Sequence, residues 1–337
     1  MITRTRPLAA LAAAALTFSL ISCGATDTSS GSGSDGVGSV GAVPSSGPSS
    51  SGATSPGAAG STSSESGGVT GGAGSVAAGG VVQAAADLVP AEIRERGTLV
   101  VATGEGYPPF EFYAEDNTTL TGVDPDLVAA VAGALGLQPD LQVLKFDGII
   151  PGLQGGRYDM AAAAMGVTDE RNKVVDFVTY FEGGTSIMTA ADNPLGLTLD
   201  NLCGHRIAAQ KGTIYADNYL PLFNQTCLDA GQSEITVDIY PDAAQTNLAV
   251  GNGRADAVVS DFGPLAYAAQ QANGQFFVLD ASYDPAPYGF AVPNGSELAP
   301  AIEAALDAIV ADGTYGEILD KWDVATGAIT DPTVSRG

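Results

Sequence analysis

The segment 165–171, Met-Gly-Val-Thr-Asp-Glu-Arg, has the residue types and spacing of a site that holds a carboxylate. It follows a short apolar run, 159–164, which suits a buried strand better than a helix. Thr168 is a favourable N-cap and two acidic residues follow it, so we expect a helix to begin here. Arg171 would project from the first turn, where a guanidinium beside free helix N–H groups can bind both carboxylate oxygens. The alternative is a surface arginine paired with an acidic residue of its own helix.

The near absence of histidine limits other chemistry. His205 is the one histidine of the sequence and precedes a predicted strand, so we expect neither a histidine-based catalytic triad nor a zinc cluster. We therefore expect no catalytic residue, no metal site and no cofactor.

The composition indicates an acidic protein with enough apolar residues for two folded lobes. The 337 residues are 45% hydrophobic, sufficient for one large core or two medium ones. Lys and Arg number 13 against 38 Asp and Glu, and the formal charge of -25 is spread without runs of like charge. Such a charge repels phosphate backbones, so we expect no nucleic-acid partner.

The N-terminus has the pattern of an exported protein with a lipid anchor. Arg4 and Arg6 precede an apolar run, 8–21, that is too short to span a membrane, as in a secretory signal peptide. The run ends in Leu-Ile-Ser-Cys23, which resembles the lipobox of bacterial lipoproteins, where the cysteine becomes the lipidated N-terminus. We expect cleavage after the signal peptide, 1–22, and attachment at the extracellular face of the cell membrane. The alternative is an uncleaved signal-anchor with an incidental cysteine.

Residues 23–85 are a predicted flexible tether. Gly, Ser, Thr, Ala and Pro dominate this stretch up to about residue 80, and it lacks the large apolar residues that would offset the entropy of ordering. A Gly/Ser coil of roughly 60 residues has a root-mean-square reach of about 45 Å, enough to clear the lipid headgroups.

Strands alternate with helices from residue 86 onward, the pattern of a parallel sheet covered on both faces. The first predicted set contains strands 98–103, 141–146, 158–163 and 175–180, with helices 90–96, 126–135 after an Asp124 cap, and 148–153 after an Asp147 cap. The second set contains strands 206–210, 235–240, 256–260 and 275–280, with helices 213–228, 243–251 after an Asp242 cap, and 264–271. Strand 288–293 and helices 298–311 and 315–322 then return to the first set.

The predicted fold class is therefore α/β with two lobes, each a mostly parallel sheet flanked by helices. Lobe 1 comprises residues 86–188 and 288–325, lobe 2 comprises residues 189–287, and 326–337 form a C-terminal tail. The two crossings, near 187–191 and 288–292, would form a hinge.

Two cysteines remain once Cys23 is assigned to the lipid. Cys203 and Cys227 form an even pair in an oxidising compartment, about 24 residues apart, and we predict a disulfide inside lobe 2. The alternatives are two buried thiols or a metal pair with His205, which would lack further ligands.

Several short motifs, taken in order, resemble those of the polar amino acid-binding family of solute-binding lipoproteins that serve bacterial ABC importers. The matching stretches are 98–110 with its Tyr-Pro-Pro-Phe, 122–126, 146–153, 157–159, 168–171 and 210–213. An ordered set is far more specific than any one motif. The resemblance covers residues 97–322 and implies a type II periplasmic-binding-protein-like fold whose lobes close over a ligand without performing chemistry.

The resemblance also implies a ligand-binding role for individual residues. Arg171 matches the arginine that binds the α-carboxylate, and Asp261, from the other lobe, matches the acid that binds the α-ammonium. The other implied contacts are the flanking aromatics Tyr107 and Phe146, the main chain of Ala164 and Gly166, a second carboxylate contact from Thr213, and Met165 and Thr168 of the opening segment. Core packing is the alternative for the two aromatics, and helix capping is the alternative for Asp261.

Two positions depart from the family pattern. Gly166 stands where many relatives carry Ser or Thr, so a hydroxyl to the carboxylate is missing, at about 0.5–1.5 kcal/mol of binding. Gly104 stands where some relatives carry an Asp that contacts a ligand amine or amide. We therefore expect a ligand side chain that is larger or less polar than usual.

These observations predict a membrane-tethered, monomeric solute-binding protein that captures a small ligand, an amino acid, and delivers it to an ABC permease. One alternative is an enzyme of the same fold, similar to cyclohexadienyl dehydratases, which would turn over prephenate or arogenate. Another is a sensor or receptor lipoprotein that binds a different solute.

Overall fold

The computed structural model describes residues 80–279 and 283–337, so the predicted signal peptide, Cys23 and the tether up to residue 79 lie outside the described residues. The α-helices are α1 (Gln83–Ala86), α2 (Ala91–Arg96), α3 (Val123–Ala134), α4 (Ile149–Gln154), α5 (Asp169–Asn172), α6 (Leu220–Asp229), α7 (Ala243–Gly251), α8 (Phe262–Gln271), α9 (Ala299–Ala311) and α10 (Thr314–Lys321). The segments of 3-10 or π type are η1 (Phe146–Gly148), η2 (Tyr215–Tyr219) and η3 (Ala325–Gly327). The strands are β1 (Thr98–Thr103), β2 (Phe112–Tyr113), β3 (Leu120–Thr121), β4 (Gln138–Val143), β5 (Met160–Ala161), β6 (Val175–Ala190), β7 (Arg206–Gln210), β8 (Thr236–Tyr240), β9 (Ala257–Asp261), β10 (Phe276–Val278), β11 (Tyr283–Pro293) and β12 (Val334–Ser335).

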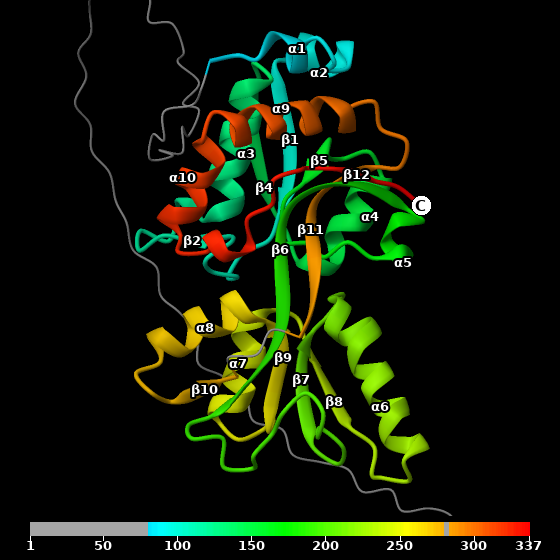
Figure 1. Ribbon diagram of the computed structural model, residues 1–337, viewed down its shortest axis with the longest axis vertical. Coiled ribbons are helices and arrows are strands. Elements are labelled where there is room, and N and C mark those ends of the chain that lie inside the picture. The colour runs from blue at the N-terminus through cyan, green and yellow to red at the C-terminus, as the bar shows by residue number, and fades with distance from the viewer. Residues whose placement is uncertain (1–79, 280–282) are drawn as a thin grey trace, which may run out of the picture. The chain divides into compact units, whose positions relative to one another are not determined.

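A 10-stranded sheet forms the centre of the described chain, in the order β4-β1-β5-β11-β6-β9-β7-β8, with β10 and β12 paired to β6. The set β4-β1-β5 is parallel, and so is the set β9-β7-β8. Between them, β6 and β11 pair antiparallel and run from one set of helices to the other (Figure 1). The predicted α/β architecture, two lobes joined by two crossings, is confirmed.

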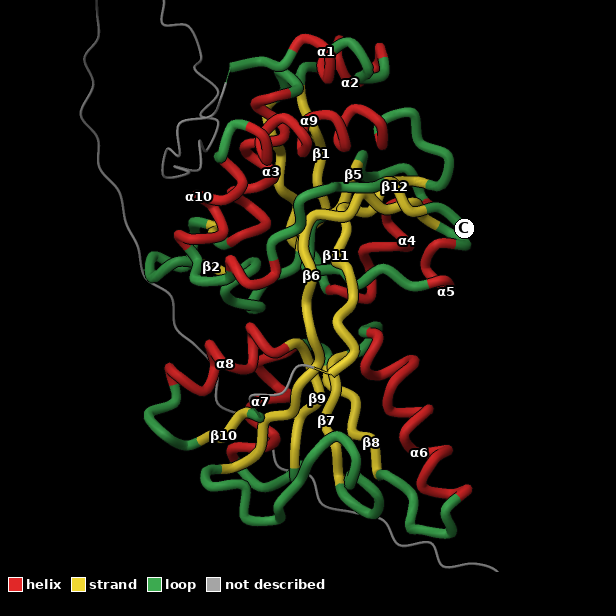
Figure 2. The backbone as a smooth tube through the Cα atoms, in the orientation of Figure 1, coloured by secondary structure: helices red, strands yellow, loops and turns green. Residues whose placement is uncertain are grey.

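The first crossing differs in position from the prediction. Strand β6 is continuous: it pairs with β11 up to Thr185 and with β9 from Thr185 onward (Figure 2). The chain therefore enters lobe 2 near Thr185 rather than at 187–191, and the boundary expected after residue 188 falls inside β6. The reason is that the strand continues through Glu-Gly-Gly at 182–184 without a turn. The residues after it, 185–189, are all buried and belong to the same strand.

Asp124 and Asp147 do not cap helices, contrary to expectation. Helix α3 begins at Val123 after Gly122, where an added Cβ would lie 2.1 Å from the Phe110 carbonyl oxygen, so this close approach of two backbones sets the helix start. Asp124 thus lies inside the helix and is fully buried. Asp147 lies within η1 and pairs with Lys211 of lobe 2. Asp242 does cap α7, accepting the Gln245 N–H at 3.0 Å.

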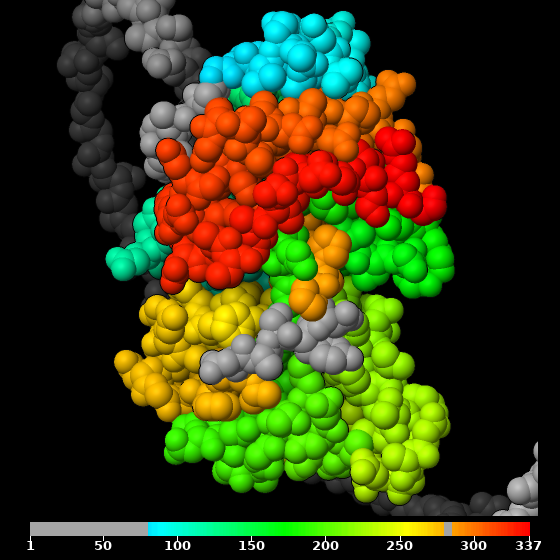
Figure 3. Space-filling view, in the orientation of Figure 1, coloured from blue at the N-terminus to red at the C-terminus, as the bar shows by residue number. Residues whose placement is uncertain are grey.

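Both chain segments that were predicted to be loose, 80–85 and 326–337, contact lobe 1. The Val82 N–H donates to the Ala134 carbonyl at 2.8 Å, and α1 follows, so order begins before residue 86. Strand β12 pairs with Val178 and Phe177 of β6, and the C-terminal segment lies across this face of the lobe (Figure 3). The 326–337 stretch lacks a long apolar run, which is why its sequence resembles a tail.

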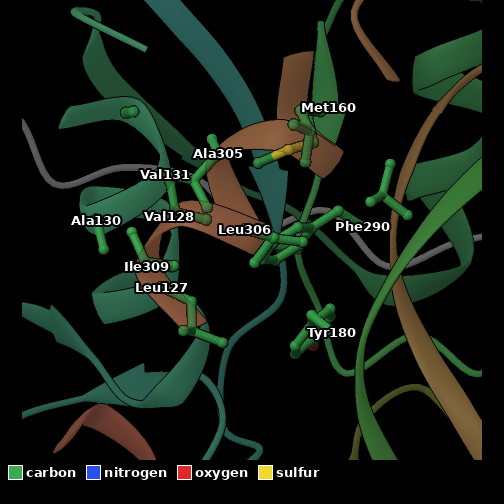
Figure 4. Close-up of a cluster of buried hydrophobic side chains, with 14 of the residues drawn as sticks. Leu127, Val128, Ala130, Val131, Met160, Tyr180, Phe290, Ala305, Leu306 and Ile309 are labelled. Atoms are coloured by element: carbon green, nitrogen blue, oxygen red, sulfur yellow. The ribbon is translucent and has the colours of Figure 1, made fainter. Parts of the chain in front are cut away.

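The core of lobe 1 lies between the sheet and helices α3 and α9. Its centre contains Leu127, Val128 and Val131 from α3 and Ala305, Leu306 and Ile309 from α9, packed on Met160 and Phe290 (Figure 4). In lobe 2, successive residues of β6 feed opposite faces: Ile187 joins one buried cluster and Met188 the other, as the two-residue period of a strand requires.

The predicted disulfide between Cys203 and Cys227 is present, with 5.5 Å between the two Cα atoms. It joins the loop before β7 to helix α6. Among the described helices, none is long and apolar enough to cross a membrane. The described residues also contain no group of three or more potential metal ligands.

Candidate ligand-binding site

A cavity between the two lobes collects most of the predicted site residues. Seven of them line it: Tyr107, Phe146, Ala164, Gly166, Arg171, Thr213 and Asp261. They lie at the end of β9 or in the segments that follow β1, β4, β5 and β7. These are the carboxyl ends of parallel strands, where ligand sites of α/β sheets form.

Met165 and Thr168 are not part of this wall. The Met165 side chain is 1% exposed and packs in the core beneath the cavity with Phe177. Thr168 caps α5, and its Oγ1 accepts the Arg171 N–H at 3.2 Å. Ala164 and Gly166 line the cavity while the Met165 side chain between them lies in the core.

Arg171 is held by main-chain oxygens of both lobes. Its Nη1 donates to the Gly166 carbonyl at 2.6 Å and its Nη2 to the Gly212 carbonyl at 3.0 Å. The guanidinium carbon lies 5.6 Å from the centre of the Phe146 ring. Burial lowers the pKa of Arg171 to about 10, so the side chain remains charged at neutral pH. The surface-arginine alternative is wrong, because the guanidinium bonds these two carbonyls at the cavity and is in none of the ion pairs of the described residues, while Glu170 pairs with Lys173.

Asp261 ends β9 at the floor of the cavity and accepts hydrogen bonds from three tyrosine hydroxyls. These belong to Tyr107 of lobe 1, Tyr215 of lobe 2 at 2.6 Å, and Tyr288 of the returning strand β11. Burial raises the pKa of Asp261, and the three hydroxyl donors partly offset that rise. Its side chain makes no capping hydrogen bond to the described residues of α8, so the capping alternative is wrong.

Tyr215 and Tyr288 were missed by the sequence reasoning. Tyr215 lies two residues after Thr213, and Tyr288 lies at the predicted second crossing. Their approach to Asp261 depends on three segments meeting in space, so neither local pattern identifies the tyrosines.

Glu111 was also missed, although it directly follows the Tyr-Pro-Pro-Phe motif. It lines the cavity, is only 2% exposed, and its Oε2 has no hydrogen-bond partner among the described residues. A Cβ at Gly104 would lie 3.2 Å from Glu111 Oε1, so the glutamate uses space that a side chain at 104 would need. Glu111 thus places a carboxylate in the cavity wall beside Gly104.

The protonation of Glu111 depends on its acidic surroundings. Burial raises the pKa of this carboxyl well above its usual range, and the nearby Asp124 and Asp261 raise it further. A cation brought close to Glu111 would lower the pKa again and favour the ionised form.

Ile214 of the second lobe approaches the cavity wall at Gly166. A Cβ at Gly166 would lie 3.3 Å from Cδ1 of Ile214, which therefore approaches the position of the missing side chain. The Thr213 hydroxyl donates to the Gln210 carbonyl at 2.7 Å and accepts the Ala216 N–H at 3.3 Å.

Two ion pairs join the lobes beside the cavity. Lys211 Nζ of lobe 2 lies 2.7 Å from Asp147 of lobe 1, and Lys145 Nζ of lobe 1 lies 3.5 Å from Asp242 of lobe 2. Each lobe thus contributes one cation and one anion to these contacts.

Comparison with known proteins agrees with this geometry. Residues 99–325 match the family of bacterial extracellular solute-binding proteins, family 3, and the chain belongs to this family. It is similar to the arginine-binding protein ArgT of Corynebacterium glutamicum, 31% identical over 249 residues, which cover 74% of this chain and 82% of ArgT. The L-cystine-binding protein TcyJ of Escherichia coli K12 is 28% identical over 68% of this chain and 84% of its own length. A solved structure of an ancestral arginine-binding protein bound to arginine is 36% identical, with a TM-score of 0.61, and the match covers 67% of this chain and 98% of that one.

Proposed function

We propose that this protein captures a cationic α-amino acid outside the cell and delivers it to an ABC permease. The observation that carries the ligand class is the Glu111 carboxylate, buried in the cavity wall with one oxygen unpaired among the described residues. Burial of an ionised carboxylate is costly unless a cation or several donors accompany it. A side-chain ammonium or guanidinium of the ligand would be that cation.

The charges of the cavity wall favour the same class of ligand. Within the described residues, four acids and two bases line it: Glu105, Glu111, Asp242, Asp261, Lys145 and Arg171. The wall therefore has a formal charge of −2 when all are ionised, which attracts a ligand of net charge +1 and repels an anionic one.

The remaining wall residues suit the backbone of an α-amino acid. In our proposal Arg171 binds the α-carboxylate and Asp261 the α-ammonium, while Tyr107 and Phe146 flank the side chain that leads to Glu111. Because Arg171 and Asp261 belong to different lobes, one ligand satisfies both only when the lobes are closed, which couples binding to closure.

The names of similar proteins support this ligand class without deciding it. Two of the proteins compared above are arginine-binding, whereas TcyJ, of the same family, is named for cystine. The choice among ligands therefore depends on Glu111.

Isothermal titration calorimetry with arginine, lysine and citrulline tests the proposal. Citrulline has nearly the shape of arginine but no side-chain charge. We expect Glu111→Gln to weaken arginine binding by about 10- to 150-fold, since a hydrogen bond to a charged group contributes about 1.5–3 kcal/mol, and to change citrulline binding much less. Glu92→Gln, at an exposed acid of α2 that does not line the cavity, is the matched control. Equal binding of arginine and citrulline by the unaltered protein would contradict the cationic ligand class.

We also propose that the protein binds its ligand without converting it. The proteins reported above are named as binding proteins, which supports this role. Ligand recovered unchanged after long incubation, and no turnover of prephenate or arogenate, are the expected results. Turnover of either compound would favour the dehydratase alternative.

The membrane attachment is part of the proposal. We infer that Cys23 carries the lipid, that the tether holds a monomeric folded part at the extracellular face, and that the permease receives the ligand there. Cys23→Ser should release the protein into the medium with unchanged ligand affinity. Retention of this variant in the membrane fraction would favour an uncleaved signal-anchor. Light scattering of the released protein would report its oligomeric state.

A further inference from the structure

Asp124 lies behind the cavity wall and makes two short hydrogen bonds with lobe 1. It belongs to the first turn of α3 and is fully buried. Its Oδ2 accepts the Ala164 N–H at 2.7 Å and its Oδ1 accepts the Tyr180 hydroxyl at 2.6 Å. Asp124 does not line the cavity itself, so apart from its charge near Glu111 its effect on a ligand would pass through one of these partners.

Ala164 has a backbone conformation that alanine rarely adopts. Its φ is +43°, in the left-handed region, where the Cβ of an L-residue crowds the following carbonyl. Such a conformation persists when the surroundings impose it. The hydrogen bond from the Ala164 N–H to Asp124 is one contact that does so.

This turn directs the main chain that forms the carboxylate end of the cavity. Ala164 and Gly166 both line the cavity, and the Gly166 carbonyl accepts Nη1 of Arg171 at 2.6 Å. A change of conformation at Ala164 would move that carbonyl, and the arginine with it. The left-handed turn therefore helps to place Arg171.

We propose that Asp124 is a positioning residue for ligand binding: through the Ala164 N–H it holds the turn that places Gly166 and Arg171 against the ligand carboxylate. The inference rests on the proposed binding function but not on the class of ligand side chain. In this role Asp124 contributes a hydrogen-bond acceptor. An asparagine at this position could do the same, because its side-chain oxygen can accept the Ala164 N–H while its amide donates to the Tyr180 oxygen.

Variants at Asp124 and Ala164 test this role by calorimetry with arginine. Asp124→Ala removes the acceptor and should weaken binding by about 5- to 30-fold, the equivalent of the cost of a left-handed alanine. Asp124→Asn should stay within about threefold of the unaltered protein. Adding Ala164→Gly to Asp124→Ala should restore most of the affinity, since glycine adopts positive φ without strain. Tyr180→Phe, which removes the other hydrogen bond of Asp124, is the control and should bind normally.

A merely structural role for Asp124 makes a different prediction. It would lower stability in Asp124→Ala without recovery of affinity by Ala164→Gly, and that outcome would overturn the inference. So would unchanged affinity in Asp124→Ala. If Asp124→Ala does not fold, Asp124→Leu replaces it, because leucine fills the site without a hydrogen-bond acceptor. The ligand affinity of Asp124→Leu is then measured with and without Ala164→Gly and judged in the same way.

The ligand separates this inference from the proposed function. Agmatine, arginine without its carboxylate, should lose little affinity in Asp124→Ala, because the turn acts on the carboxylate end. If the unaltered protein binds a neutral amino acid instead, the ligand class fails. The Asp124 variants are then measured with that amino acid and judged by the same outcomes.

Discussion

Replacement of Arg171 should cost more affinity than replacement of any exposed arginine. The guanidinium donates hydrogen bonds to the Gly166 and Gly212 carbonyls, at 2.6 and 3.0 Å. In our proposal it also binds the ligand carboxylate. Arg171→Ala would leave a buried carboxylate and two carbonyls without this donor. Loss of one partner of a buried charged pair costs about 2–5 kcal/mol, so the dissociation constant should rise by roughly 30- to 4,000-fold.

Arg171→Lys separates charge from geometry. Lysine keeps the positive charge, but a single ammonium cannot reproduce the fork that reaches carbonyls of both lobes and a carboxylate. We expect affinity between those of the alanine variant and the unaltered protein, about 10- to 150-fold weaker than the latter. Small-angle scattering should show that arginine closes the unaltered protein and closes Arg171→Ala only at much higher ligand concentration.

Two controls make the result specific. Arg254→Ala removes an exposed arginine whose Nε bonds Asn252, and should leave binding unchanged. Agmatine, which lacks the carboxylate, should bind Arg171→Ala nearly as well as it binds the unaltered protein. If both substitutions at Arg171 bind arginine like the unaltered protein, the carboxylate is not held here and the ligand is not an α-amino acid bound in this orientation.

Three further outcomes follow from the same contacts. Asp147→Lys places a cation against Lys211 and should weaken ligand binding by about two- to fivefold at low salt. Adding Lys211→Asp should restore the affinity, and high salt should remove most of the effect. Burial raises the pKa of Asp124 to about 7, above its unfolded value near 4, so the folded protein holds the extra proton between these values. The stability that this group contributes should therefore be lost as the pH rises through about 7, and urea titrations should show a weaker decline with pH for Asp124→Asn. Cys203→Ser with Cys227→Ser should lower the unfolding free energy by about 3 kcal/mol, and an unchanged urea midpoint would contradict this estimate.

Local patterns were sufficient where one segment determines its own structure. Strands 98–103 and 206–210 have the predicted bounds because buried parallel strands need short apolar runs. The Thr168 cap and the start of α5 follow from neighbouring residues alone. Local patterns failed at Asp124, whose position next to a proline suggested a cap, because the helix start depends on how closely Gly122 passes Phe110.

The sequence by itself predicted the two α/β lobes and the cysteine pair, which depend on strand and helix periodicity and on cysteine number, and seven of the nine residues singled out by resemblance line the cavity. The tertiary structure decided where β6 crosses between lobes, that three tyrosine hydroxyls meet on Asp261, and that Glu111 occupies the space left by Gly104. Those features depend on distances between residues far apart in the chain. Such distances are set by how the sheets and helices pack, and no single stretch of sequence encodes them.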